Sequence, residues 1–214
     1  MPLTSRQQFV TQKPFLQQPL HVGYLVLFMV YWVYSALDTP NLLNWVTENA
    51  LTLSLLIFLA AFYNIFRFSD ASYTFIFLFL VMHVYGSQYE YSDNPLGAWL
   101  QQQFNLQRNH YDRLVHFGFG LWLAYPMHEV LNRGFKVNRL LSYILPVEFV
   151  LSLGAIYELV EWAVADILYQ GTAQGMDFLG MQGDIWDAQK DIGLGFAGSV
   201  IAMVVTYFIN SRRS

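Results

Sequence analysis

Gly183-Asp184-Ile185-Trp186-Asp187-Ala188-Gln189-Lys190-Asp191 leads directly into the last apolar segment of this chain, at 190–210. Its three aspartates are spaced i, i+3 and i+7, so a helix places them along one face. Carboxylates stacked in this way repel one another, and only 12% of the chain is charged. The row therefore indicates a bound cation, a basic partner or a protonated member. The glycines that follow, Gly193, Gly195 and Gly198, predict that this helix packs closely against another.

The composition is that of an integral membrane protein. Of the 214 residues, 55% are hydrophobic and 18% are aromatic, and the mean hydropathy is +0.33. Six apolar segments have about the roughly 20 residues that cross a bilayer as a helix. They lie at 20–37, 47–66, 71–86, 112–131, 140–164 and 190–210. We therefore expect an all-α fold, a polytopic bundle of about six transmembrane helices. A cytoplasmic segment at 1–19 would precede a single membrane domain at 20–211.

The distribution of charge predicts how the bundle is oriented in the membrane and argues against one class of partner. Most basic residues lie on the side that holds both termini and the loops after the second and fourth segments. They are Arg6, Lys13, Arg67, Arg133, Lys136, Arg139, Arg212 and Arg213. By the positive-inside rule that side, with both termini, is cytoplasmic, and the acid-rich side is the outer one. The net charge of −4 argues against nucleic acid as a partner. The absence of cysteine excludes disulfides and thiolate chemistry.

A short helix is expected in the outer loop that follows the third apolar segment. Asp93-Asn94-Pro95 supplies a capping residue and an early proline, which together are typical of a helix start. Leu96, Trp99 and Phe104 then form an amphipathic stripe. Such a helix either lies in the membrane interface or packs against the bundle without a role in chemistry.

Two further groups of residues join the aspartate row on the outer side. Asp112 and His116 are i, i+4, so they share a helix face and can bind one metal ion, or Asp112 can orient His116 as a base. The alternative is an ion-paired helix start. Glu158 and Glu161 are i, i+3 within an apolar segment, where charged side chains normally face a cavity or a partner. The alternative places Glu161 at the interface and pairs Glu158 with an arginine of 108–113.

The order of these motifs resembles a known superfamily. Asp112, His116 and Phe117, then a glutamate of the next segment, then the aspartate row with Gly195 resemble the VanZ-like bacterial membrane proteins. More closely, 108–117 and 183–192 resemble the YjdF-type inner-membrane proteins, and this likeness covers about 20–210. The resemblance implies a small polytopic protein of the bacterial inner membrane and supplies no reaction. The link of VanZ-like members to glycopeptide tolerance implies the cell envelope and its lipid-linked precursors.

We expect a metal-dependent hydrolase or transferase with its site at the outer, periplasmic surface. A lipid or lipid-linked phosphate is the expected substrate, and Mg²⁺, Mn²⁺ or Zn²⁺ the expected cofactor. The predicted metal ligands are Asp112, His116, Glu158, Glu161, Asp184, Asp187 and Asp191. The predicted catalytic residues are His116, Asp112 and Glu161. The predicted substrate-binding residues are Arg108, Arg113 and Lys190, which offer cationic donors to a phosphate.

Two other classes of function remain open at this point. The same carboxylates and His116 can relay protons or coordinate a cation in a transporter or binding protein. A purely structural protein would instead bury the charges as a salt-bridge network that fixes helix packing. The expected members of that network are Asp112, Arg113, Glu158, Glu161, Lys190 and Asp191. The sequence assigns no role to Glu148, His83 or His128.

Overall fold

The protein is built from α-helices, four of which, among the described residues, start at a side-chain cap. A computed structural model describes residues 13–170, 172, 175 and 179–212, and within them every regular element is helical. The α-helices are α2 (Pro19–Asp38), α3 (Leu42–Phe62), α4 (Asp70–Gln88), α5 (Pro95–Phe104), α6 (Tyr111–Glu129), α7 (Arg139–Ile167) and α9 (Asp187–Ser211). Short turns precede α2 (η1, Phe15–Gln17) and extend α6 (η2, Val130–Gly134). The side chains of Asn41, Ser69, Asn94 and Asn138 cap the helices that follow them.

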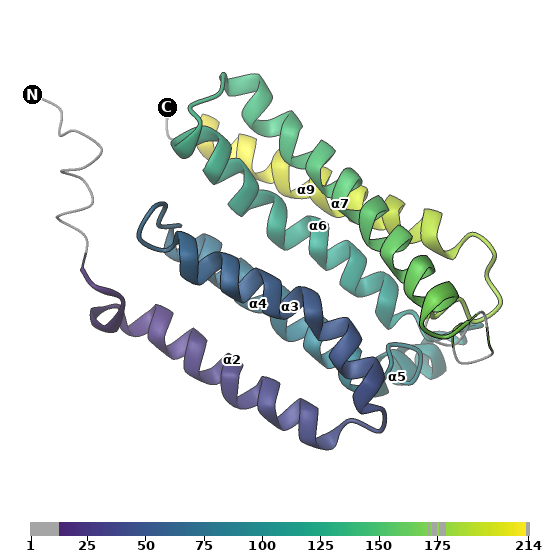
Figure 1. The fold of residues 1–214 in the computed structure, drawn as a ribbon. Coiled ribbons are helices and arrows are strands. Elements are labelled where there is room, and N and C mark those ends of the chain that lie inside the picture. The colour runs from purple at the N-terminus through teal and green to yellow at the C-terminus, as the bar shows by residue number, and fades with distance from the viewer. Residues whose placement is uncertain (1–12, 171, 173–174, 176–178, 213–214) are drawn as a thin grey trace, which may run out of the picture.

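Six long helices lie alongside one another, and α5 lies across one end of the bundle (Figure 1). These six correspond to the six apolar segments expected from the sequence. α5 occupies the predicted position, with Asn94 as its cap and Pro95 in its first turn. Of the predicted cytoplasmic segment at 1–19, residues 1–12 lie outside the described part of the chain, as do Arg6 and Arg213.

Four of the helices are long and apolar enough to cross a membrane, namely α2, α3, α7 and α9. Their outward faces carry large apolar side chains such as Leu27, Ile57 and Phe208, which are exposed in the isolated chain. α4 and α6 occupy the middle of the bundle, with α4 packed against α2, α3 and α6 and α6 packed against α4, α7 and α9. Central helices are covered by neighbours, so they accommodate more polar residues than helices that face lipid. The fold is that of a helical membrane protein.

The tightest helix contact joins α6 to α9 through glycine. A Cβ atom placed on Gly120 would lie 1.9 Å from the carbonyl oxygen of Gly195, and one on Gly198 would lie 2.3 Å from that of Phe117. The two backbones therefore touch where no side chain intervenes. The expectation of close packing is confirmed for Gly195 and Gly198. It is wrong for Gly193, which has no neighbouring atom within 4 Å of its added Cβ.

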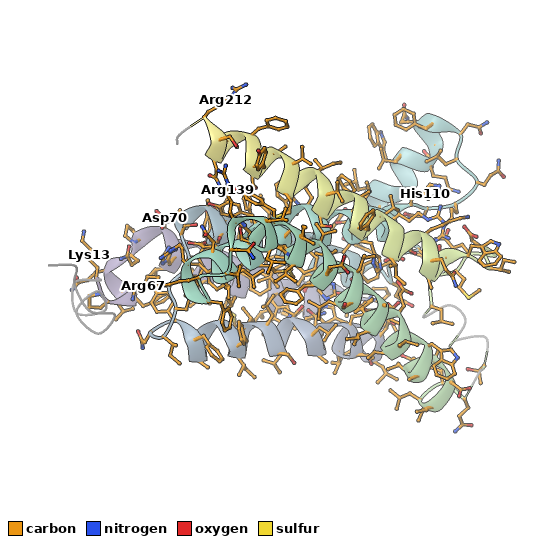
Figure 2. All side chains as sticks on the ribbon, turned by 90° about the horizontal axis from the view of Figure 1, so that it is seen from above. Lys13, Arg67, Asp70, His110, Arg139 and Arg212 are labelled. Atoms are coloured by element: carbon orange, nitrogen blue, oxygen red, sulfur yellow. The ribbon has the colours of Figure 1, made fainter. Side chains whose placement is uncertain are left out.

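The two ends of the bundle differ in charge. Lys13, Arg67, Arg139 and Arg212 lie toward one end of the molecule and His110 toward the other (Figure 2). At the basic end, the buried carboxylate of Glu129 accepts hydrogen bonds from the Ser69 amide at 2.9 and 3.1 Å and from the Ser69 hydroxyl at 2.9 Å. It also accepts from the Ser72 hydroxyl and from Arg133. Glu129 thus joins the end of α6 to the first turn of α4, where a helix favours a negative charge.

Candidate functional site

Two of the three aspartates in the row are neutralised by arginine. The guanidinium of Arg108 forms a two-pronged ion pair with Asp187, one prong measuring 3.1 Å. Arg113 donates to Asp187 at 3.0 Å and to Asp184 at 2.5 Å, and Lys190 donates to Asp184 at 2.6 Å. We call these five residues the ion-paired cluster. Because two-pronged arginine–carboxylate bonds are directional, the cluster holds the segment before α9 against the start of α6.

Arg108 also binds the backbone of the segment that leads into α9. It donates to the carbonyl oxygen of Met181 at 3.1 Å and to that of Gly180 at 3.0 Å. Gln182 adds a reciprocal pair with the backbone of Asn109, with both hydrogen bonds at 3.0 Å. A buried guanidinium with this many partners is a fixed element of the structure.

The pKa values of two groups outside the helices, Asp184 and His110, reflect the charges of this cluster. The hydrogen bond from Lys190, followed by those from the Trp186 amide and Arg113, holds the pKa of Asp184 well below its usual range. Burial, together with the charges of Arg113 and Arg108, lowers the pKa of His110. His110 therefore favours its neutral form, and its Nδ1 lies 3.2 Å from Nη1 of Arg113, where a neutral ring nitrogen can accept.

The third aspartate belongs to a different group of side chains. One ligand atom from each of Asp112, His116 and Asp191 lies within 4.8 Å of the other two. His116 Nε2 stands 3.6 Å from Asp112 Oδ1 and 3.4 Å from Glu158 Oε1. We call Asp112, His116, Glu158 and Asp191 the carboxylate–histidine cluster. Its members come from α6, α7 and α9. The contact of α6 with α9 brings Asp191 to Asp112 and His116.

Asp191 is buried without the partners that a buried carboxylate normally has. Only 2% of the residue is exposed. Its Oδ1 has no hydrogen-bond partner in the part of the chain that the structure describes. Buried charges are normally paired or coordinate a metal, because an isolated one is very costly. The cations of the ion-paired cluster all contact Asp184 or Asp187 instead. The unpaired oxygen makes Asp191 a candidate ligand for a cation.

Glu161 lines an adjoining small cleft of about 10 Å³ together with Asp112, which the sequence predicted. Two further acids of the same cleft, Glu48 and Glu90, were missed by sequence reasoning. Glu48 is buried on α3 and accepts a hydrogen bond of 2.9 Å from the Tyr157 hydroxyl. The signal that could have found Glu48 is its place in an apolar helix, where an acidic residue needs a partner. Its tyrosine partner comes from α7 and could not be inferred from sequence.

An apolar cavity of about 460 Å³ extends from the carboxylate–histidine cluster toward the middle of the bundle. Asp112, His116, His83 and Tyr157 line it near the cluster, and the rest of its lining is mostly aliphatic and aromatic. α3, α4, α6 and α7 supply the walls. Volumes of this size are typical of small-molecule sites.

The salt-bridge network of the structural alternative is present in part. Arg113 and Lys190 are members of it, as expected, but in the described residues their ion pairs go to Asp184 and Asp187 and not to the four acids named for it. The expected pairing of Glu158 with an arginine is wrong, since its partner is His116. Three hydrogen bonds involve the histidines left without a role. His83 Nε2 donates to the Glu48 carbonyl, and its Nδ1 is hydrogen-bonded to the Tyr91 hydroxyl. His128 Nδ1 donates to the Ser142 carbonyl. Glu148 is exposed on α7.

The fold and the site define a multi-pass helical membrane protein with a buried carboxylate–histidine cluster at its acidic end. The chain belongs to the DUF2238 family of predicted membrane proteins, whose pattern matches residues 20–212. It is 33% identical over 195 residues to the inner membrane protein YjdF of Escherichia coli (strain K12), a match that covers 91% of this chain and 90% of that protein. No solved structure matches the chain. The YjdF-type resemblance is thereby confirmed, while the wider VanZ-like relationship stays a prediction.

Proposed function

We propose that this protein is a metal-dependent hydrolase or transferase of the inner membrane that acts on a lipid phosphate at the outer membrane surface. The observation that carries the proposal is the buried, unpaired Oδ1 of Asp191 beside Asp112 and His116. We take all six long helices as membrane-spanning, with α4 and α6 as the polar central pair and both termini cytoplasmic. The inner-membrane location rests on the name of the E. coli relative, and the orientation on the basic residues.

The carboxylate–histidine cluster has the right composition for a divalent ion. Carboxylates with one imidazole suit Mn²⁺, Zn²⁺ or Mg²⁺, and Glu158 provides a fourth ligand beside His116. Ligand bonds of about 2.0–2.2 Å place two ligand atoms at most about 4.4 Å apart. The three atoms within 4.8 Å therefore need only small side-chain rotations to close on one ion. The charge of the ion would offset the mutual repulsion of the carboxylates.

The chemistry of such an ion is to acidify a bound water and to neutralise a phosphoryl oxygen. Glu161 lines the cleft next to Asp112, so we assign it the role of the base that accepts the proton of that water. Asp184 and Asp187 are less available than Asp191 as metal ligands, because Arg113 and Arg108 already form ion pairs with them. Lys190, whose side chain is about half exposed, is the cation best able to exchange Asp184 for a phosphate.

The first test is the metal content of purified protein. After incubation with Mn²⁺ and desalting, mass spectrometry of the elements should find bound metal in the wild type and a loss of it in Asp191→Asn. Asp166→Asn is the matched control, because Asp166 is an exposed carboxylate on α7. Wild-type protein that retains no more metal than Asp191→Asn would sink the proposal.

The second test is turnover of a lipid phosphate. Phosphatidic acid and a polyprenyl diphosphate, each in detergent with Mn²⁺, are incubated with the protein and analysed for released phosphate. Glu161→Gln should bind metal as the wild type does and release no phosphate. Release that is equal in Glu161→Gln and wild type would remove Glu161 from the mechanism, and a lack of release by both from either substrate would argue against lipid phosphates as substrates.

A salt-bridge function remains favoured for one part of the site. The ion-paired cluster satisfies its charges internally, as the structural alternative requires. We therefore assign it the role of holding α9 in place so that Asp191 reaches the carboxylate–histidine cluster.

A further inference from the structure

The apolar cavity opens toward the bilayer between two helices. Several residues of its lining are about half exposed on the outside of the molecule. They are Leu51 and Phe58 on α3, and Leu153, Ile156 and Val160 on α7. α3 packs mainly on α4, whereas α7 packs mainly on α6 and α9. Few contacts join α3 to α7, among them the hydrogen bond from Tyr157 to Glu48. An opening with such a rim, in the middle of membrane helices, admits hydrocarbon and not water.

The floor of the cavity is apolar and lies deep in the bundle. Leu80, Val115 and Leu123 line it and are each exposed by less than a tenth of their surface. Lipids that merely surround the protein cannot reach these three side chains. The half-exposed lining residues on α3 and α7 mark the side from which an occupant can reach them.

One polar group inside the cavity has no partner. Thr52 is 2% exposed, lines the cavity, and its hydroxyl makes no hydrogen bond in the part of the chain that the structure describes. It lies one helical turn from Glu48 toward the middle of α3. A hydroxyl buried in apolar surroundings favours an occupant that offers an acceptor at that depth. The ester carbonyl of a glycerolipid, which lies between the phosphate-bearing glycerol and the acyl chain, is such an acceptor.

We propose that the cavity holds one acyl chain of a phosphate-bearing glycerolipid, which enters from the bilayer between α3 and α7 and directs its phosphate toward the carboxylate–histidine cluster. The ester lies near Thr52, and the chain runs over Leu80 and Val115. The position of the head group rests on the proposed function. The position of the chain rests only on the shape and lining of the cavity.

Photolabelling from the lipid side tests this proposal. The full chain is reconstituted in phosphatidylcholine vesicles with a small fraction of phosphatidic acid that carries a diazirine near the end of one acyl chain. After irradiation, peptide mass spectrometry should find label on Leu80 and Val115. Leu27, an exposed residue of α2, reports the background from surrounding lipid. Label on Leu27 without label on the floor residues would overturn the proposal.

Two further lipid probes show which class of lipid the cavity prefers. A diazirine-bearing diacylglycerol, which lacks the phosphate, should label the floor less than phosphatidic acid does. A diazirine-bearing polyprenyl phosphate, which lacks the ester, should do the same. Floor labelling by the polyprenyl probe alone would overturn the assignment to a glycerolipid.

Variants that fill the cavity provide the matched comparison. Gly154→Leu places a side chain in the lining, where the added Cβ meets only Ile192 at 4.0 Å. Gly23→Leu makes the same change on α2, where no atom lies within 4 Å. Floor labelling should be lost in Gly154→Leu and kept in Gly23→Leu. Leu153→Trp at the rim repeats the test without burying the new side chain. Floor labelling that is retained in both Gly154→Leu and Leu153→Trp would contradict the proposal.

The metal measurement distinguishes the two proposals. Floor labelling of a protein that binds no metal would refute the proposed function and support the acyl-chain site. Metal binding with an unlabelled floor would refute the acyl-chain site and leave the proposed function standing.

Discussion

Glu129 and Asp191 are both buried carboxylates, one at each end of the bundle, with 4% and 2% of the residue exposed. Glu129 is surrounded by donors, because Ser69, Ser72 and Arg133 all bind it. In the part of the chain that the structure describes, no donor contacts Oδ1 of Asp191, which is grouped with Asp112 and His116.

The two carboxylates differ in whether donors from the fold stabilise them. The first turn of α4 and Arg133 stabilise the charge of Glu129, so its burial needs no ligand. Among the described residues, no hydrogen bond reaches Oδ1 of Asp191, and Arg108, Arg113 and Lys190 form their ion pairs with Asp184 and Asp187. This contrast supports the proposal that Asp191, and not Glu129, is a ligand of a cation.

Replacing each carboxylate by its amide should change the stability of the protein most, and by different amounts at the two ends of the bundle. Glu129→Gln presents an NH₂ group to donors and leaves Arg133 without its anion, so it should lower the free energy of unfolding by about 3–5 kcal/mol. Asp191→Asn should leave metal-free protein as stable as the wild type or more so. Thermal unfolding in detergent with a chelator measures both. Equal losses in the two variants would show that Asp191 is as structural as Glu129.

Moving α6 away from α9 tests how Asp191 reaches its site. Gly120→Ala forces a methyl group into the carbonyl of Gly195, and we expect a cost of about 3 kcal/mol, at the upper end for overpacking. Metal retention should fall as well, because Asp191 moves from His116. Gly193→Ala, in open space, is the control and should change neither melting temperature nor metal content. The Glu129 contacts lie at the other end and should survive.

The ion-paired cluster should respond to loss of its central arginine. Arg108→Gln removes the two-pronged bond to Asp187 and two bonds to backbone carbonyls. Arg113 still contacts Asp187, so the loss should be smaller than for Glu129→Gln, about 1–3 kcal/mol. The melting temperature in detergent measures it. A variant as stable as the wild type would mean that this half of the site does not hold α9.

Acidification should give the smallest effect. Since the pKa of Asp184 is lowered in the folded protein, its ion pairs stabilise the fold fully above the ordinary aspartate pKa of about 3.9 and are lost as the pH falls toward the lowered value. The difference in melting temperature between wild type and Asp184→Asn should therefore shrink between about pH 5 and pH 3. High salt should reduce it too, because this pair is near solvent. A difference that is independent of pH would exclude the charge of Asp184 as its cause.

Much of this architecture could be predicted from the sequence alone. The six apolar segments, the cap at Asn94 and the glycines Gly195 and Gly198 all depend on local pattern, and the helices and the close α6–α9 contact follow them. The convergence of Asp112 with His116 could be foreseen for the same reason, because i, i+4 spacing places both on one face of one helix. Glu48 was missed, because its contact with Tyr157 joins residues that are 109 positions apart.

The aspartate row illustrates the limit of prediction from sequence. Spacing alone determined that Asp184, Asp187 and Asp191 follow one another at the start of the last helix, because helical periodicity is a local property. Which of them meets a cation was decided only by the packing of α6 on α9. That packing brings Arg108 and Arg113 to the first two and His116 to the third. The reason is that the strength of an ion pair depends on distance and desolvation, which only the folded chain sets.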